Sequence, residues 1–281
     1  MGKDFSMSIK LIALDIDGTL LNSSMEVTPA TIDALNKANE RGIHIVLSTG
    51  RLVAECEDIL HKLPCIRYVN SCTGAEVVDL RNGCSVAGRR IPGEEARRLY
   101  QLLKDLDVMP CAFDPVDGKP HCCIEAYRRC MEACSAEVAA HLQRYYHPEE
   151  DFEGYLAKVQ CLIKYYMPCF TKQAITDVAQ RMKDEPYTVV QCGPADMEII
   201  PVGTDKGLGL QLLAEALELE RDQVMAIGDS ENDLGMLRYA GLPVVMGNGS
   251  EEAKACAKYI TDDNDHEGVA KAITMVLEGL L

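Results

Sequence analysis

No stretch of this 281-residue sequence reaches the roughly 18 consecutive apolar residues that cross a bilayer, which argues against a membrane-spanning helix. The first residues also lack the apolar core of a secretory signal peptide, so we expect a cytoplasmic protein. Positive charge is scarce, because 28 Lys and Arg face 44 Asp and Glu and give a formal net charge of -16. A chain this acidic is not expected to bind nucleic acid or an anionic membrane.

Cysteine is abundant, at 13 residues, but the paired spacing of a structural zinc site is missing. Cys122 and Cys123 are adjacent, and Cys130 and Cys134 stand four apart without a second pair nearby. Structural zinc sites need two well-spaced pairs of ligands. We therefore expect reduced thiols that pack as small apolar side chains.

The most informative feature that is present is a pair of acids, Asp15 and Asp17, directly after a short apolar run. The run 9–14 is compatible with a β-strand and Gly18-Thr19 ends it, which predicts a central strand of a parallel sheet. Side chains at the carboxyl end of such a strand open into the crevice where α/β sheets bind ligands. Two acids spaced i, i+2 on a strand share one side, and a divalent cation usually offsets their repulsion. For this motif alone, a solvated turn is an equal alternative.

Strands and helices alternate along the first part of the chain and again along its last part. The expected strands are 9–14, 43–47, 67–70, 223–227 and 243–246. Thr28-Pro29 is expected to begin one helix, Lys206 another, and a last helix is expected near 268–277. This alternation indicates βαβ units and a parallel sheet.

The pattern changes between about Asn82-Gly83 and Ile200. Here helices expected near 94–106, 126–146 and 171–183 are interleaved with hairpin-like strands, such as 111–113 and 121–124 with a turn at Asp117-Gly118. Helices mixed with antiparallel hairpins indicate an α+β module. We therefore expect an α/β protein in which residues 1–83 and 201–281 form a Rossmann-like core and residues 84–200 form an inserted α+β cap.

Four groups of polar residues fall where parallel strands, or the helices after them, open into one crevice. They are Asp15 with Asp17, Thr49, Lys206, and Asp229 with Asp233. An aspartate can attack phosphorus, a second acid can protonate the leaving oxygen, and a hydroxyl and an ammonium can hold the remaining oxygens. Oxygen ligands favour Mg²⁺ over zinc. Together these groups predict a phosphoryl-transfer site.

Four ordered motifs carry a family resemblance: Asp15-Ile16-Asp17-Gly18-Thr19-Leu20, Ser48-Thr49-Gly50-Arg51, Asp205-Lys206-Gly207 and Gly228-Asp229-Ser230-Glu231-Asn232-Asp233. Over nearly its whole length the chain resembles the haloacid dehalogenase (HAD) superfamily, and within it the Cof-type (subclass IIB) sugar-phosphate phosphatases. The resemblance implies a Rossmann-like core with a C2-type cap, and a Mg²⁺-dependent phosphatase that hydrolyses small phosphorylated metabolites such as sugar phosphates.

The resemblance also implies roles for the acids. Asp15 would attack phosphorus and become an aspartyl phosphate, and Asp17 would protonate the leaving alcohol and then activate water. Mg²⁺ would be held by an Asp15 carboxylate oxygen, the Asp17 main-chain carbonyl and Asp229. Asp233 would support the metal or orient Lys206.

The remaining site residues are expected to contact the substrate. Thr49 and Lys206 would bind the transferring phosphoryl group, although a hydroxyl before glycine can also simply cap the next helix. Gly50, Arg51 and Asn232 are the substrate-side candidates, with a surface salt bridge as the competing role for Arg51.

The sequence departs from the family pattern at two places and leaves two other functions open. Thr73 precedes Gly74 where Asn-Gly-Ala is often found, and Asp205 stands where a serine or threonine frequently precedes the lysine. A phosphomutase, or a protein of this fold that binds phosphorylated metabolites without turnover, is the alternative to a phosphatase. The sequence does not indicate the oligomeric state.

Overall fold

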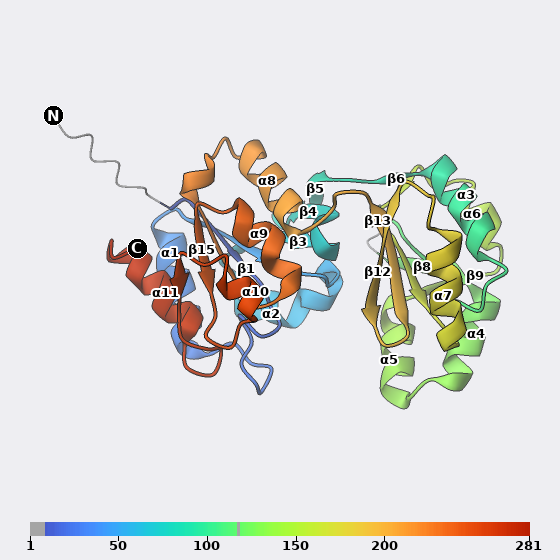
Figure 1. The fold of residues 1–281 in the computed structure, drawn as a ribbon, viewed down its shortest axis with the longest axis horizontal. Coiled ribbons are helices and arrows are strands. Elements are labelled where there is room, and N and C mark those ends of the chain that lie inside the picture. Colours follow the sequence, from blue (N-terminus) through green and yellow to red (C-terminus); the bar gives the residue numbers. More distant parts are fainter. Residues whose placement is uncertain (1–8, 117–118) are drawn as a thin grey trace. The chain divides into compact units, whose positions relative to one another are not determined.

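The computed structural model describes residues 9–116 and 119–281, which form two compact units (Figure 1). The core unit runs up to Gly88 and resumes from Asp205 to Leu281, and the inserted unit is Arg89–Thr204. The predicted boundaries at 83/84 and 200/201 therefore need correction. Strand β5 (Cys84–Gly88) pairs with β4 (Glu76–Asp79) in the core sheet, so these residues do not belong to the insertion.

An eight-stranded sheet of order β16-β15-β14-β1-β2-β3-β4-β5 forms the centre of the core unit. The six strands from β16 to β3 are parallel, and β4 and β5 are antiparallel to their neighbours. The parallel strands are β1 (Leu11–Leu14), β2 (His44–Ser48), β3 (Ile66–Ser71), β14 (Val224–Gly228), β15 (Leu242–Val245) and β16 (Tyr259–Ile260). The expectation of an α/β core with a parallel sheet is thus confirmed.

The core sheet is covered on both faces, which explains why its strands read as unbroken apolar runs. On one face Ile12 and Leu14 of β1 belong to the apolar cluster that includes α1 (Pro29–Glu40) and α11 (Gly268–Leu277). On the other face Leu11 and Ala13 join the cluster of α8 (Lys206–Ala216) and α9 (Leu234–Tyr239). This packing on both faces holds β1 in the centre of the sheet, and Asp15 follows its last residue.

The core helices begin where the sequence predicts. The Thr28 hydroxyl accepts a hydrogen bond from the amide of Thr31, and Pro29 lies in the first turn of α1. The shorter helices are α2 (Glu57–Lys62), α10 (Glu251–Lys254) and the 3₁₀ turns Val53–Cys56, Cys72–Gly74, Arg221–Gln223 and Glu231–Asp233. In the described part of the chain, no helix combines the length and apolarity needed to cross a bilayer.

The inserted unit is an α+β module, as the mixed pattern predicts. Its six-stranded sheet has the order β12-β13-β11-β7-β8-β9, and a separate pair is β10-β6. The strands are β6 (Ile91–Pro92), β7 (Cys111–Phe113), β8 (Pro120–Cys123), β9 (His147–Glu149), β10 (Cys161–Leu162), β11 (Tyr165–Pro168), β12 (Tyr187–Gly193) and β13 (Asp196–Pro201). The helices are α3 (Gly93–Leu103), α4 (Ile124–Ala133), α5 (Ala136–Tyr145), α6 (Phe152–Leu156) and α7 (Lys172–Arg181).

The inserted unit confirms one local prediction and corrects another. β7 and β8 form the expected antiparallel pair, whereas the expected turn at Asp117-Gly118 lies outside the described residues. The single helix expected over 126–146 is wrong, because α4 and α5 are separated by Cys134 and Ser135 in extended conformation. The Ser135 hydroxyl accepts from the amide of Val138 and so starts the second helix.

The cysteines are free thiols, and six of the 13 are buried, as expected. Cys56, Cys72 and Cys111 are fully buried, for example. Cys84 and Cys192 are instead exposed, so the expectation of packed thiols does not hold for these two.

Candidate active site

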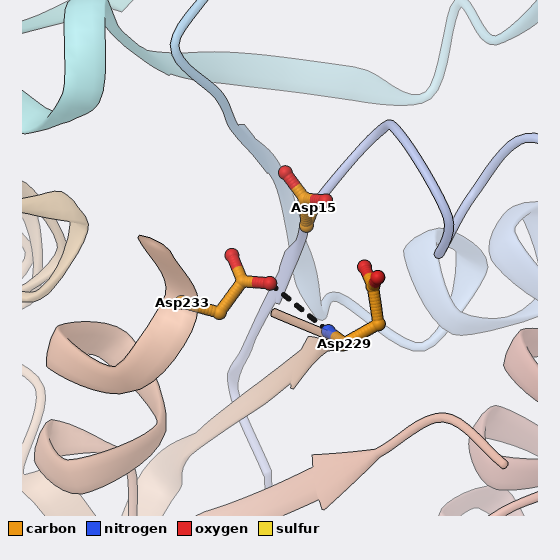
Figure 2. Close-up of side chains that lie close together, drawn as sticks. All are labelled: Asp15, Asp229 and Asp233. Atoms are coloured by element: carbon orange, nitrogen blue, oxygen red, sulfur yellow. Dashed lines mark hydrogen bonds between the residues drawn. The ribbon is translucent and has the colours of Figure 1, made fainter. Parts of the chain in front are cut away.

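Three carboxylates converge beyond the carboxyl edge of the core sheet (Figure 2). Asp15 follows β1 directly, Asp229 follows β14, and Asp233 ends the 3₁₀ turn after Asp229. One carboxylate oxygen of each lies within 4.8 Å of the others. Because β1 and β14 are adjacent parallel strands, their ends bring the acids together. We call these three residues the acid cluster.

Lys206 supplies a cation to the acid cluster. Its side chain is fully buried, and Nζ donates to Asp15 Oδ1 at 2.6 Å, to Asp233 Oδ1 at 2.7 Å and to Asn232 Oδ1 at 3.2 Å. Burial raises the pKa of Asp15 to about 7, with the Lys206 ammonium acting in the opposite direction. Burial also opposes the charge of Lys206, but Asp15 and Asp233 together outweigh it and raise the Lys206 pKa.

Asp233 both orients Lys206 and shapes the turn that carries Asp229. Its second oxygen, Oδ2, accepts from the amides of Asp229 at 2.9 Å, drawn in Figure 2, and of Ser230 at 3.1 Å. Gly228 is needed for this approach, since a Cβ at that position would lie 2.6 Å from Asp233 Cγ. The fully buried Asp233 thus links the ammonium to the loop after β14.

Asp229 is held by a residue whose role the sequence did not reveal. The Thr19 hydroxyl donates to Asp229 Oδ1 at 2.8 Å, and a Cβ at Gly18, where φ is +82°, would lie 2.6 Å from Asp229 Oδ2. Burial raises the pKa of Asp229, and the Thr19 hydrogen bond opposes the shift. The signal was present in the sequence, because Gly18-Thr19 belongs to the same motif as Asp15.

The acid cluster is suited to a divalent cation. The cluster has three carboxylates and one ammonium, which pairs with Asp15 and Asp233, so the ionised cluster keeps an excess of negative charge. Its donors are all oxygen atoms, which match the preference of Mg²⁺. Asp15 and Asp229 are therefore able to hold such an ion. Asp233, expected to support the metal or orient Lys206, also brings a carboxylate oxygen within 4.8 Å of theirs.

Asp17 lies apart from the acid cluster, and its carboxylate pairs with Arg51. β1 ends at Leu14, before both acids, so strand alternation does not place them on one side: Asp15 is buried and Asp17 is exposed. Arg51 Nε donates to Asp17 Oδ2 at 3.1 Å, and Nη2 donates to Oδ1. Burial opposes the charge of Arg51, but Asp17 more than compensates and raises the Arg51 pKa. Arg51, a candidate for substrate contact, thus contacts Asp17 in this structure.

Thr49 lies one residue beyond β2 and is buried. Its hydroxyl accepts from the Arg51 amide at 3.1 Å, so it takes part in the local turn. Within the described residues, no hydrogen bond joins Thr49 to Asp15 or Lys206. Gly50, between Thr49 and Arg51, is exposed.

Lys206 is positioned by contacts at the first turn of α8, made by its own carbonyl group and by Asp205. The Asp205 carboxylate caps α8 by accepting from the Leu208 amide at 2.7 Å, the capping role that serine or threonine can play elsewhere. Asn70 Nδ2 donates to the Lys206 carbonyl at 2.8 Å. Gly74, with φ +89°, lies so near that a Cβ would be 1.8 Å from the Asp205 carbonyl oxygen. The two departures from the family pattern, Thr73 and Asp205, therefore lie in segments that position Lys206: Thr73 precedes Gly74, and Asp205 caps α8.

We expect Gly74→Ala to destabilise the protein by about 3–5 kcal/mol and to lower activity, because the methyl group displaces the first turn of α8. Gly42→Ala is the matched control. Gly42 has a similar φ of +79° but open space around its Cβ position, so it should lose only about 1–2 kcal/mol. Urea unfolding measures the free energy of unfolding of both variants. Equal losses in the two would show that the close approach of Gly74 to the Asp205 carbonyl does not matter for stability.

Comparisons with known proteins identify the family of this chain. A model of the haloacid dehalogenase-like hydrolase family matches residues 12–273. A Streptococcus pyogenes serotype M6 protein with the name "Putative phosphatase M6_Spy0533" is 33% identical over 95% of this chain and 98% of its own. A 5-amino-6-(5-phospho-D-ribitylamino)uracil phosphatase of Bacillus subtilis is 27% identical over 95% of each chain. The structure of a Bacteroides thetaiotaomicron protein, described among phosphatases of the HAD superfamily, has a TM-score of 0.76 and 28% identity over 98% of both chains.

Proposed function

The chain belongs to the haloacid dehalogenase-like hydrolases, in which it is a phosphoric monoester hydrolase, and we propose that it works through an aspartyl phosphate on Asp15 with Mg²⁺ as cofactor. One observation carries the proposal: the buried Asp15 carboxylate lies next to the buried Lys206 ammonium and near Asp229, at the edge of the sheet where ligands bind.

Asp15 is the residue suited to attack phosphorus. Lys206 contacts only its Oδ1 and holds that side of the carboxylate in place, while Asp233 in turn holds the Lys206 ammonium. A fixed, desolvated carboxylate can form a covalent acyl phosphate, which divides hydrolysis into two easier steps. As the bond from the phosphorus to the leaving oxygen breaks, the phosphoryl group is transferred to an Asp15 oxygen. Water then hydrolyses the aspartyl phosphate, which frees the Asp15 carboxylate and releases inorganic phosphate.

Asp17 is suited to move the proton in both steps. It is exposed, two residues from Asp15, and Arg51 holds both of its oxygens. We propose that Asp17 in its protonated form donates to the leaving alcohol, and that the carboxylate so formed takes a proton from the attacking water. Release from Arg51 is part of this proposal, because a carboxylate that accepts two bonds from a guanidinium is held ionised.

A phosphate monoester dianion and the attacking Asp15 carboxylate together bring three negative charges into the site, and this acidic chain must offset them locally. Lys206 supplies one positive charge, and Thr49, Gly50 and Asn232 are proposed to contact phosphoryl or substrate oxygens. Mg²⁺, held by Asp15, Asp229 and the Asp17 main-chain carbonyl, supplies the remaining charge compensation when bound. The inserted unit is proposed to act as a cap that selects the leaving group.

We propose small phosphorylated metabolites as substrates. The relatives include phosphatases named for 5-amino-6-(5-phospho-D-ribitylamino)uracil, a phosphorylated sugar-alcohol derivative. Sugar phosphates and this ribityl phosphate therefore belong in the first panel to be tested.

The test is phosphate release from p-nitrophenyl phosphate and from that panel, with Mg²⁺ or with excess EDTA. We expect turnover with Mg²⁺, a loss of at least about 100-fold after chelation, and recovery when Mg²⁺ is restored. Zn²⁺ in place of Mg²⁺ tests the preference for an oxygen-ligated ion. Full activity in EDTA would refute the cofactor, and phosphoryl transfer to a second sugar without phosphate release would indicate a mutase.

We expect Asp17→Asn to release a burst of about one equivalent of p-nitrophenolate, followed by turnover slowed about 100- to 10,000-fold. p-Nitrophenolate leaves without a proton, so phosphoryl transfer to Asp15 still occurs in this variant. Hydrolysis of the aspartyl phosphate, in contrast, still needs a base. Stopped-flow absorbance measures the burst. A hexose phosphate should show no burst with the same variant, because its alkoxide needs the acid. Wild-type rates for Asp17→Asn on both substrates would remove Asp17 from the mechanism.

A further inference from the structure

A second cleft lies at the edge of the core sheet opposite to the acid cluster. It has a volume of about 480 Å³ and is bounded by the amino ends of β2 and β3 and by the residues after β4. Its lining includes His44, Arg67, Arg81, Ile43, Ile66 and Leu80, and none of the proposed active-site residues. His44 and Thr49 stand at opposite ends of β2, about 16 Å apart at the rise of a strand. The two sites are therefore separate.

The cleft carries a positive charge that pairs with no described acidic side chain. Arg67 is paired with the buried Asp79, through Nη2 to Oδ2 at 2.9 Å and Nε to Oδ2 at 3.3 Å. The Arg81 amide also donates to Asp79, at 3.0 Å. The exposed Arg81 guanidinium, in contrast, forms no ion pair with any described residue. One acid thus faces two guanidiniums, in a chain whose formal net charge is -16.

His44 adds a hydrogen-bonding group to the same cleft. Its ring packs edge-on against Tyr68, with 5.8 Å between the centroids, and the described residues form no hydrogen bond to its nitrogens. Burial lowers the pKa of His44, and the charges of Arg67 and Arg81 lower it further. The neutral ring offers one N–H donor beside the cations.

We propose that this cleft binds a small organic oxyanion, a phosphate or carboxylate group attached to an apolar or planar body. The Arg81 guanidinium presents the planar fork that matches an oxyanion, and the His44 N–H is a second donor. Leu80, which is partly buried, provides an apolar surface for the body of the ligand, above the buried Ile43 and Ile66. The volume falls within the range of small-molecule sites. The site is independent of the proposed function.

The test is a titration followed by the ring resonances of His44 in histidine-labelled protein, assigned with His44→Gln. The probes are phenylphosphonate, which has no phosphate ester to hydrolyse, benzoate, and benzyl alcohol as the neutral analogue. We expect a saturable shift of the His44 signals with an anionic probe, and an affinity about tenfold or more weaker in Arg81→Gln. Arg238→Gln removes the same charge from an exposed arginine of α9 that forms no ion pair with a described residue, and should bind as the wild type does.

The two anionic probes distinguish the ligand classes. A response to phenylphosphonate alone supports a phosphate ester, a response to benzoate alone supports a carboxylate, and a response to both supports an oxyanion of either kind. Equal affinities in Arg81→Gln and wild type would overturn the proposal, as would an equal response to benzyl alcohol or no saturable response to either anion. Because the signal comes from His44, binding at Lys206 cannot imitate it, and phosphatase activity has no bearing on the result.

Discussion

Asp15→Asn is expected to reduce kcat for phosphate release by about 10,000-fold or more while leaving the protein folded. The amide keeps the shape of the side chain and can still accept from Lys206, whose Nζ lies 2.6 Å from Asp15 Oδ1. It lacks the negative charge and nucleophilicity that bond formation to phosphorus requires. Steady-state rates with p-nitrophenyl phosphate and far-ultraviolet circular dichroism measure the two parts of this expectation.

Asp33→Asn is the matched control for this substitution. Asp33 is an exposed acid on α1 that pairs with Lys37 one turn away, so its loss should change neither rate nor stability by a measurable amount. Rapid quenching of the wild type, followed by mass analysis of the peptide that carries residue 15, should reveal one added phosphoryl group. Substantial turnover by Asp15→Asn, or phosphorylation of another side chain, would disprove the covalent route.

The local patterns of the sequence predict the core better than the insertion. Leu11–Leu14 is apolar without a break because both faces of β1 are covered, and this pattern identifies a parallel strand. Pro29 and its capping threonine likewise determine the start of α1 locally. The split between α4 and α5 depends on one serine cap, which a helical pattern over 126–146 conceals. β5 joins the core sheet through a hairpin with β4. Asn82-Gly83 is a local turn signal for this hairpin, but it does not tell whether the second strand belongs to the core or to the insertion.

Part of the candidate site could likewise be predicted from the sequence, and part could not. Asp15, Lys206, Asp229 and Asp233 gather as predicted. For Asp15 and Asp229 the reason is that adjacent parallel strands place their carboxyl ends at one edge, whereas Lys206 begins α8 and depends on how that helix packs. The pairing of Arg51 with Asp17 could not be predicted, since it depends on how two loops after neighbouring strands meet.

The charge balance of the acid cluster leads to the second large effect. We expect Lys206→Met to lower kcat by about 1,000-fold or more, and to destabilise the protein without added Mg²⁺ by about 3–5 kcal/mol near pH 8. Lys206 is fully buried between Asp15 and Asp233, so its removal leaves buried carboxylates without a counter-charge. Lys37→Met removes an exposed lysine from the Asp33 pair and should change stability by less than about 1 kcal/mol.

The pH dependence of this loss separates a charge effect from a packing effect. The folded-state pKa of Asp15 is already raised from 3.8 to about 7 by burial, and without the Lys206 ammonium it must rise further. A raised carboxyl pKa means that the folded state binds the proton more tightly, so its stability is greatest at low pH and decreases as the pH rises through that pKa. Lys206→Met should therefore be less destabilising near pH 5 than near pH 8, with Asp15 contributing about 1.4 kcal/mol to the difference, as measured by urea unfolding in EDTA. Adding Asp15→Asn should restore part of the lost stability at the higher pH but none of the activity. An equal loss at both pH values, with no rescue, would mean that the lysine contributes packing rather than charge.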